Sequence, residues 1–128
     1  MTYLVDTHIF VWFLDKNEKL KPLYRQILID RRNDFVFSTM VLAEVKHLIS
    51  QKRIQVDFGK VVAFLRESNN CAIHPVDEDV VDEMPAGLCI RDALIVATGL
   101  VYKNILQKEV TILTEDEEII RSHILPVA

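Results

Sequence analysis

The stretch Tyr3-Leu4-Val5-Asp6-Thr7 places an acidic residue directly after a short apolar run. Three consecutive apolar residues predict a β-strand, and a strand this short and apolar is expected in the middle of a sheet, buried on both faces. An acid at the end of a buried strand loses its hydration, which is costly unless the carboxylate gains a partner. The stretch therefore predicts a central strand and a partner for Asp6, which is either a helix N-terminus or a metal ion.

Short apolar runs alternate with amphipathic stretches along the rest of the chain. Strands are expected at 3–5, 35–37, 71–76 and 110–113, and 123–127 is a candidate for a fifth. Helices are expected over 7–14, after Pro22, after Ser38 or Thr39, after Asp57, over 77–84 and from Ile90. This alternation is typical of a parallel sheet covered by helices. We therefore predict an α/β fold, a single three-layer domain over residues 1–128 with a central parallel sheet of four to five strands flanked by helices.

The composition is that of an ordinary globular domain. The chain has 128 residues, of which 50% are hydrophobic and 27% charged, and these values suit one domain with a sizeable core. No run reaches the ~18 apolar residues of a membrane span, and no basic leader precedes the apolar run at 9–14, so a cytoplasmic protein is expected. Cys71 and Cys89 lack metal-site spacing and are expected to be buried free thiols.

Charge is distributed unevenly along the chain. Residues 1–74 contain 11 Lys and Arg against 8 Asp and Glu, a net charge of +3, whereas residues 75–128 contain 4 against 11, a net charge of −7. The basic excess is either a set of solvated helix faces or a flank that steers phosphates toward an acidic site.

Four acidic residues stand at the boundaries of the predicted elements. Asp6 and Asp116 follow predicted strands, beyond whose carboxyl ends parallel sheets bind their ligands. Glu44 and Asp92 lie on predicted helices that could lean over the same edge. Each acid also has a purely structural interpretation, as a helix cap, a first-turn charge or the edge of an apolar face. Carboxylates brought together repel unless a hard cation neutralises them, so their order predicts a Mg²⁺ or Mn²⁺ site that acts on a phosphate ester.

Neighbouring polar residues could complete such a site. Thr7 and Thr114 stand beside two of the acids and could orient a carboxylate or a water molecule. Glu115 adjoins Asp116 and could replace it as a ligand. His8 stands where a phosphatase with an aspartyl nucleophile needs a second aspartate, which argues against that enzyme class.

The ordered acids and their contexts resemble the PIN-domain nucleases, particularly the VapC-type toxins of toxin–antitoxin pairs. The resemblance spans nearly the whole chain. It rests on the segments 3–8 (YLVDTH), 42–44 (LAE), 91–98 (RDALIVAT) and 112–116 (ILTED), of which 91–98 is the most specific. It implies a parallel sheet flanked by helices, a Mg²⁺ or Mn²⁺ site, RNA cleavage, a homodimer and inhibition by an antitoxin protein.

The expected function is thus that of a Mg²⁺- or Mn²⁺-dependent ribonuclease toxin in which a metal-activated water cleaves RNA. The expected catalytic and metal-binding residues are Asp6, Glu44, Asp92 and Asp116, supported by Thr7 and Thr114. The candidate RNA-binding residues are Lys16, Lys19, Arg25 and Arg91. The aromatic residues Phe10, Trp12 and Phe13 either pack in the core or face a protein partner. The alternative function is a catalytically silent PIN-like module that binds RNA or protein.

Overall fold

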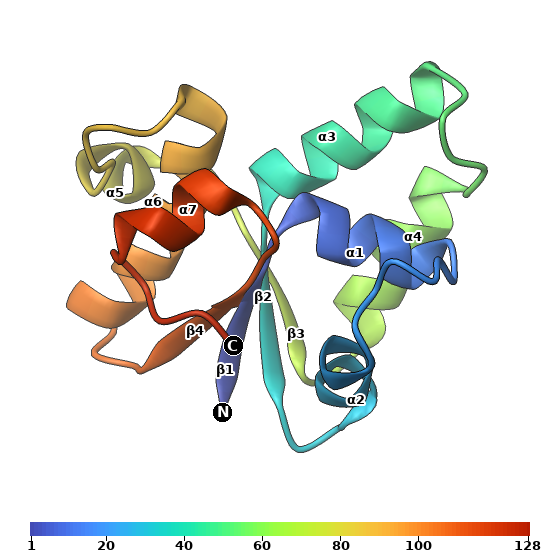
Figure 1. The fold of residues 1–128 in the computed structure, drawn as a ribbon, viewed down its shortest axis with the longest axis horizontal. Coiled ribbons are helices and arrows are strands. Elements are labelled where there is room, and N and C mark those ends of the chain that lie inside the picture. The colour runs from blue at the N-terminus through green and yellow to red at the C-terminus, as the bar shows by residue number, and fades with distance from the viewer.

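A computed structural model describes residues 1–128 and contains a four-stranded parallel sheet at its centre (Figure 1). The strands are β1 (Thr2–Val5), β2 (Asp34–Ser38), β3 (Cys71–His74) and β4 (Val110–Leu113), in the spatial order β3-β2-β1-β4. Every neighbouring pair is parallel, so the carboxyl ends of all four strands meet at one edge of the sheet.

The first strand is central, as its apolar run predicts. Tyr3 of β1 pairs with Phe35 of β2 on one side and with Thr111 of β4 on the other. Leu4 and Val5 are completely buried. By contrast, β3 is an edge strand that stops at His74, before the proline that could not donate to a ladder.

Helices cover both faces of the sheet. They are α1 (Thr7–Leu14), α2 (Pro22–Ile29), α3 (Thr39–Ser50), α4 (Phe58–Glu67), α5 (Glu78–Asp82), α6 (Ile90–Asn104) and α7 (Glu117–Ser122). Figure 1 shows α1, α2 and α4 on one side of the sheet and α5, α6 and α7 on the other, while α3 extends away from the carboxyl end of β2. The predicted three-layer α/β architecture is therefore confirmed.

Side-chain caps explain where most of the helices begin. An oxygen of the preceding side chain accepts a first-turn N–H in five of them, from Asp6, Ser38, Asp57, Asp77 and Asp116. In α2 a proline occupies the first turn, where its missing N–H costs nothing. Two of the five capping residues belong to the predicted acidic cluster, so capping and site geometry are linked in this fold.

Two details differ from the sequence-based expectations. The possible fifth strand at 123–127 does not form: Val127 makes only an isolated bridge to Ile112, because α7 extends to Ser122 and Pro126 has no N–H to donate. Cys89 is exposed just before α6 rather than buried, and Cys71 is only half-buried. No helix has the length and apolar character needed to cross a membrane.

Candidate metal centre

The four predicted acids lie on four different elements at the carboxyl edge of the sheet. Asp6 directly follows β1 and Asp116 follows β4, whereas Glu44 is on α3 and Asp92 is in the first turn of α6. The side chain of Arg91 brings three of them together, because its guanidinium forms ion pairs with Glu44, Asp92 and Asp116.

Asp6 is buried, with 1% of its surface exposed. Its Oδ1 accepts the Thr7 backbone N–H at 2.7 Å, and its Oδ2 accepts the Thr114 hydroxyl at 2.6 Å. Burial raises the pKa of the Asp6 carboxyl above its usual value, and the two hydrogen bonds and the positive charge of Arg91 oppose that rise. Asp6 is therefore a fixed acid whose orientation is set by both neighbouring threonines.

Thr7 connects the first acid to the second. Its backbone N–H contacts Asp6, and its hydroxyl donates to Oε1 of Glu44, which is 37 residues away in the sequence. The other carboxylate oxygen of Glu44, Oε2, accepts from Arg91 Nη1 at 3.0 Å. Each oxygen of Glu44 thus has a different donor.

Asp116 also divides its two oxygens between two tasks. Oδ1 accepts the backbone N–H groups of Glu118 and Ile119 at 2.9 and 3.2 Å and caps α7. Oδ2 lies 3.4 Å from Arg91 Nη2. The backbone N–H of Asp116 donates to the Thr114 hydroxyl at 3.0 Å. The cap interpretation and the site interpretation are therefore compatible for this residue.

Glu115, the alternative to Asp116, turns toward a different partner. Its Oε1 lies 2.9 Å from Lys21 Nζ, at the start of α2. The ion pair holds Glu115 outside the group formed by Arg91 and the other acids. The structure thus places Asp116, rather than Glu115, with the acidic group.

Asp92 and Arg91 are adjacent in the first turn of α6. Nε and Nη2 of Arg91 both donate to Oδ1 of Asp92, at 3.1 and 2.7 Å, and Asp92 is buried. Partial burial alone would lower the pKa of Arg91, but the hydrogen bond to Asp92 and the charges of Glu44, Asp92 and Asp6 raise it above the usual value. The guanidinium is firmly cationic in this position.

The carboxylate oxygens of the four acids are chemically suited to a divalent cation. Three of these acids, however, are spaced around the guanidinium of Arg91. All four acids offer carboxylate oxygens, the ligands that Mg²⁺ and Mn²⁺ prefer. No three acidic, histidine or cysteine side chains lie close enough together to hold one metal ion. The guanidinium explains this spacing, because it lies between the oxygens of Glu44, Asp92 and Asp116.

The other predicted RNA-binding residues lie on the segment that joins α1 to α2 and on α2 itself. Lys16 and Lys19 are exposed, and Arg25 on α2 is half-buried. The sequence alone does not show that Lys21, rather than Lys16 or Lys19, forms an ion pair with an acidic residue. The ion pair of Lys21 with Glu115 shows that this segment passes beside the loop between β4 and α7.

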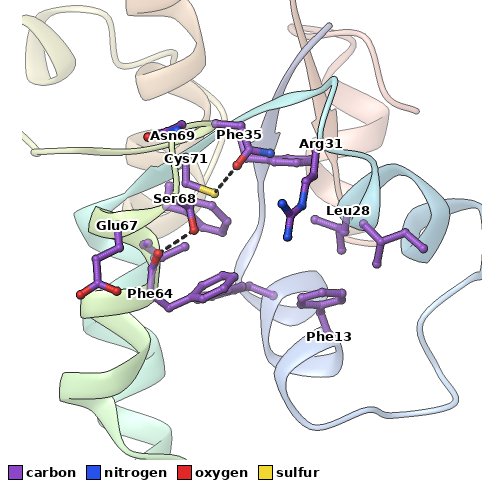
Figure 2. Close-up of a pocket in the computed structure, with 14 residues that line it drawn as sticks. Phe13, Leu28, Arg31, Phe35, Phe64, Glu67, Ser68, Asn69 and Cys71 are labelled. Atoms are coloured by element: carbon purple, nitrogen blue, oxygen red, sulfur yellow. Dashed lines mark hydrogen bonds between the residues drawn. The ribbon is translucent and has the colours of Figure 1, made fainter.

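A cavity lies away from the acids. Its volume is about 630 Å³, and it opens near the amino ends of β2 and β3, beside Phe35 and Cys71 (Figure 2). Phe10 and Phe13 both line the cavity. Phe10 is buried in the core, whereas Phe13 and Trp12 are half-buried. None of the four acids lines this cavity.

Comparisons with known proteins agree with this fold. The model of the PIN domain family matches residues 3–123. A chain in the crystal structure of VapBC2 from Rickettsia felis, bound to a DNA fragment from their promoter, superposes with a TM-score of 0.67 at 17% sequence identity. That match covers 100% of this chain and 98% of the other, and at this identity it establishes a shared fold. A search of curated proteins finds no match.

Proposed function

Because the chain belongs to the PIN domain family, we propose that it is a divalent-metal-dependent ribonuclease that hydrolyses RNA phosphodiester bonds. The observation that supports this proposal most strongly is the convergence of Glu44, Asp92 and Asp116 on one cation, with Asp6 buried at the same edge of the sheet. Acidic residues used only as caps have no reason to share one cation. A group of carboxylates at the carboxyl edge of a parallel sheet is suited to binding a metal ion and a phosphate.

The four acids Asp6, Glu44, Asp92 and Asp116 would hold Mg²⁺ or Mn²⁺, directly or through water. When bound, the ion would lower the pKa of a coordinated water and stabilise the charge that develops on the phosphate. Thr7 and Thr114 keep the first acid in one orientation, and Thr7 does the same for one oxygen of Glu44. The reaction needs no cysteine or histidine nucleophile.

Basic residues beside the site would hold the RNA backbone. The acidic group repels phosphate, so flanking cations are needed to retain a polyanion. We assign this role to Lys16, Lys19 and Arg25. Their support is the ion pair of Lys21 with Glu115, which brings the segment between α1 and α2 next to the loop that bears Asp116. Neutralising Lys16 and Lys19 together should weaken RNA binding and reduce its dependence on salt.

Cleavage of labelled RNA in Mg²⁺, Mn²⁺ or excess EDTA tests the proposal. Cleavage is expected with either metal and should stop in EDTA, whereas equal cleavage in EDTA would contradict the metal mechanism. Asp6→Asn should lower the cleavage rate by at least ~100-fold, because it removes a ligand charge from the centre. Asp15→Asn is the matched control, since Asp15 is an exposed residue at the end of α1 and should leave the rate unchanged. No cleavage of any RNA in any metal would favour the silent binding module.

The same family membership supports a proposal about partners. We assign to the protein the role of a toxin that forms homodimers and is inhibited by an antitoxin. The similar fold in a VapBC2 complex is consistent with this assignment. Light scattering during size-exclusion chromatography should give twice the mass of one chain. A small reading frame immediately upstream, co-expressed with this chain, should suppress RNA cleavage; suppression that persists when the frame carries an early stop codon would contradict the assignment.

A further inference from the structure

Arg91 is the one basic residue that forms an ion pair with any of the four acids. It contacts three of them from the first turn of α6, through Nη1 to Glu44 at 3.0 Å and through Nη2 to Asp92 and Asp116 at 2.7 and 3.4 Å. We propose that the Arg91 guanidinium is an internal cation that occupies the metal centre in the metal-free protein and must leave before a divalent ion can bind. This inference rests on the proposed metal dependence, and it adds that a side chain of the protein competes with the metal ion.

The oxygens that Arg91 contacts are the ones that a metal ion would need. Oε1 of Glu44 already accepts the Thr7 hydroxyl, whereas Oε2 has no donor other than Arg91. Oδ1 of Asp116 already caps α7, whereas Oδ2 has no donor other than Arg91. The arginine and a metal ion would therefore compete for these two oxygens and for Oδ1 of Asp92.

The site is sheltered enough for this competition to matter. Side-chain exposure is 29% for Arg91, 19% for Glu44, 5% for Asp92 and 24% for Asp116. Ion pairs in such partly buried surroundings are screened less than those on an open surface. At the same time, the remaining exposure of Arg91 leaves it a path outward to solvent.

Release of Arg91 would also change the charge at the rim of the site. Without a cation, the three carboxylates would repel one another, so the metal-free protein keeps the arginine inward. Once a divalent ion replaces it, the guanidinium remains attached to the first turn of α6 beside the substrate. A guanidinium matches phosphate oxygens through paired N–H groups, so metal loading would free Arg91 to hold the RNA backbone.

Titration calorimetry with Mn²⁺ alone tests the competition without any measurement of cleavage. Arg91→Gln should bind Mn²⁺ about tenfold or more tightly than the wild type. In the wild type Arg91 closes the site most of the time, so only the small open fraction binds Mn²⁺ and the apparent dissociation constant is higher. Arg121→Gln is the matched control. Arg121 also lies close to two carboxylates, Glu117 and Glu118, but on the exposed surface of α7, and its replacement should leave Mn²⁺ affinity unchanged.

Arg91→Lys separates occupancy of the site from a simple effect of charge. Lysine keeps the positive charge, but its single ammonium group cannot replace the fork that spans three carboxylates. The lysine variant should bind Mn²⁺ several-fold more tightly than the wild type, and wild-type affinity in this variant would overturn the proposal. This comparison also stands if the glutamine variant does not fold.

The outcomes also separate this inference from the proposed function. Mn²⁺ binding that is equal or weaker in Arg91→Gln overturns the inference and leaves the metal-dependent nuclease intact. No Mn²⁺ binding by the wild type or by either Arg91 variant overturns both. Mn²⁺ binding by the two Arg91 variants but not by the wild type supports the proposal that Arg91 occupies the metal centre.

Discussion

Thr114 offers a sharp test of how the acidic site is held together. Its hydroxyl donates to Asp6 Oδ2 at 2.6 Å and accepts the backbone N–H of Asp116 at 3.0 Å, and the residue is 1% exposed. Replacing Thr114 by valine preserves the shape of the side chain and creates almost no cavity. It removes both hydrogen bonds, so the effect on stability should come from them rather than from packing.

The expected loss follows from those two bonds. A hydrogen bond to a charged group contributes about 1.5–3 kcal/mol, and the partly buried N–H of Asp116 left without an acceptor costs about 1 kcal/mol. Thr114→Val should therefore lower the free energy of unfolding by about 2.5–4 kcal/mol at pH 7. The loss of the Thr114 hydroxyl also raises the pKa of Asp6 further, because that hydroxyl favours the ionised form.

The pH dependence provides an independent check on this reasoning. The folded variant binds a proton at Asp6 more tightly than the folded wild type does, so the stability difference should shrink as the pH falls through the pKa of Asp6. Urea unfolding in EDTA, followed by the fluorescence of Trp12, can measure this difference at pH 7 and pH 4. Thr111→Val is the control, since Thr111 is half-buried on β4, the strand that Thr114 follows, and forms no side-chain hydrogen bond.

Two results would refute the reasoning about Thr114. One is a loss at pH 7 no larger than that of the Thr111 control, which should stay within about 0.5 kcal/mol. The other is a loss of the same size at both pH values, because it would show that the ionised form of Asp6 is not what the hydroxyl stabilises.

Three further predictions concern metal binding, a buried phenol and a tight contact. Mn²⁺ at 100 times its dissociation constant should raise the free energy of unfolding by about 2.7 kcal/mol, and this gain should be lost in Asp6→Asn, as measured by urea titration. Tyr24→Phe should cost about 1 kcal/mol in the same assay, since the phenol O–H has the backbone oxygens of Thr114 and Ala128 within hydrogen-bond distance and donates its one proton to them. Burial raises the pKa of Tyr24, so the folded state keeps its proton longer; wild-type stability should fall as the pH rises above ~10, and the phenylalanine variant should lack this component. Gly99→Ala should cost about 1–3 kcal/mol by thermal unfolding, because the new Cβ would lie 2.6 Å from Leu125 and 3.1 Å from Leu4; an unchanged midpoint would show that both leucines yield freely.

Local patterns were sufficient to predict the architecture and to place the four candidate acids at one edge of the sheet. The apolar run before Asp6 predicted a central strand, and the alternation of strands and helices predicted the parallel sheet that brings the acids to one edge. These features depend on neighbours in the sequence, so they could be inferred from it. From the sequence, a helix cap and a site residue are alternative roles for Asp116. In the structure the two roles do not exclude each other, because the two carboxylate oxygens of Asp116 have different partners.

Features set by distant contacts could not be predicted. Glu115 and Asp116 are adjacent acids, and only the ion pair with Lys21 shows that Glu115 turns away. The sequence predicts Arg91 as a residue for RNA, but it does not show that the Arg91 side chain turns toward three carboxylates from α3, α6 and the start of α7. The exposure of Cys89 likewise depends on how the chain approaches α6 rather than on the apolar residues beside it.

The pairing of β1 with β4 has a consequence for when the site can first exist during synthesis. The central strand is the first to leave the ribosome, yet its partner on one side begins only at Val110. Asp6 and Asp116 therefore meet only after the segment through β4 has emerged. A translation product that is truncated before β4 lacks one neighbour of β1 and also lacks Asp116, so the four acids are never assembled in it.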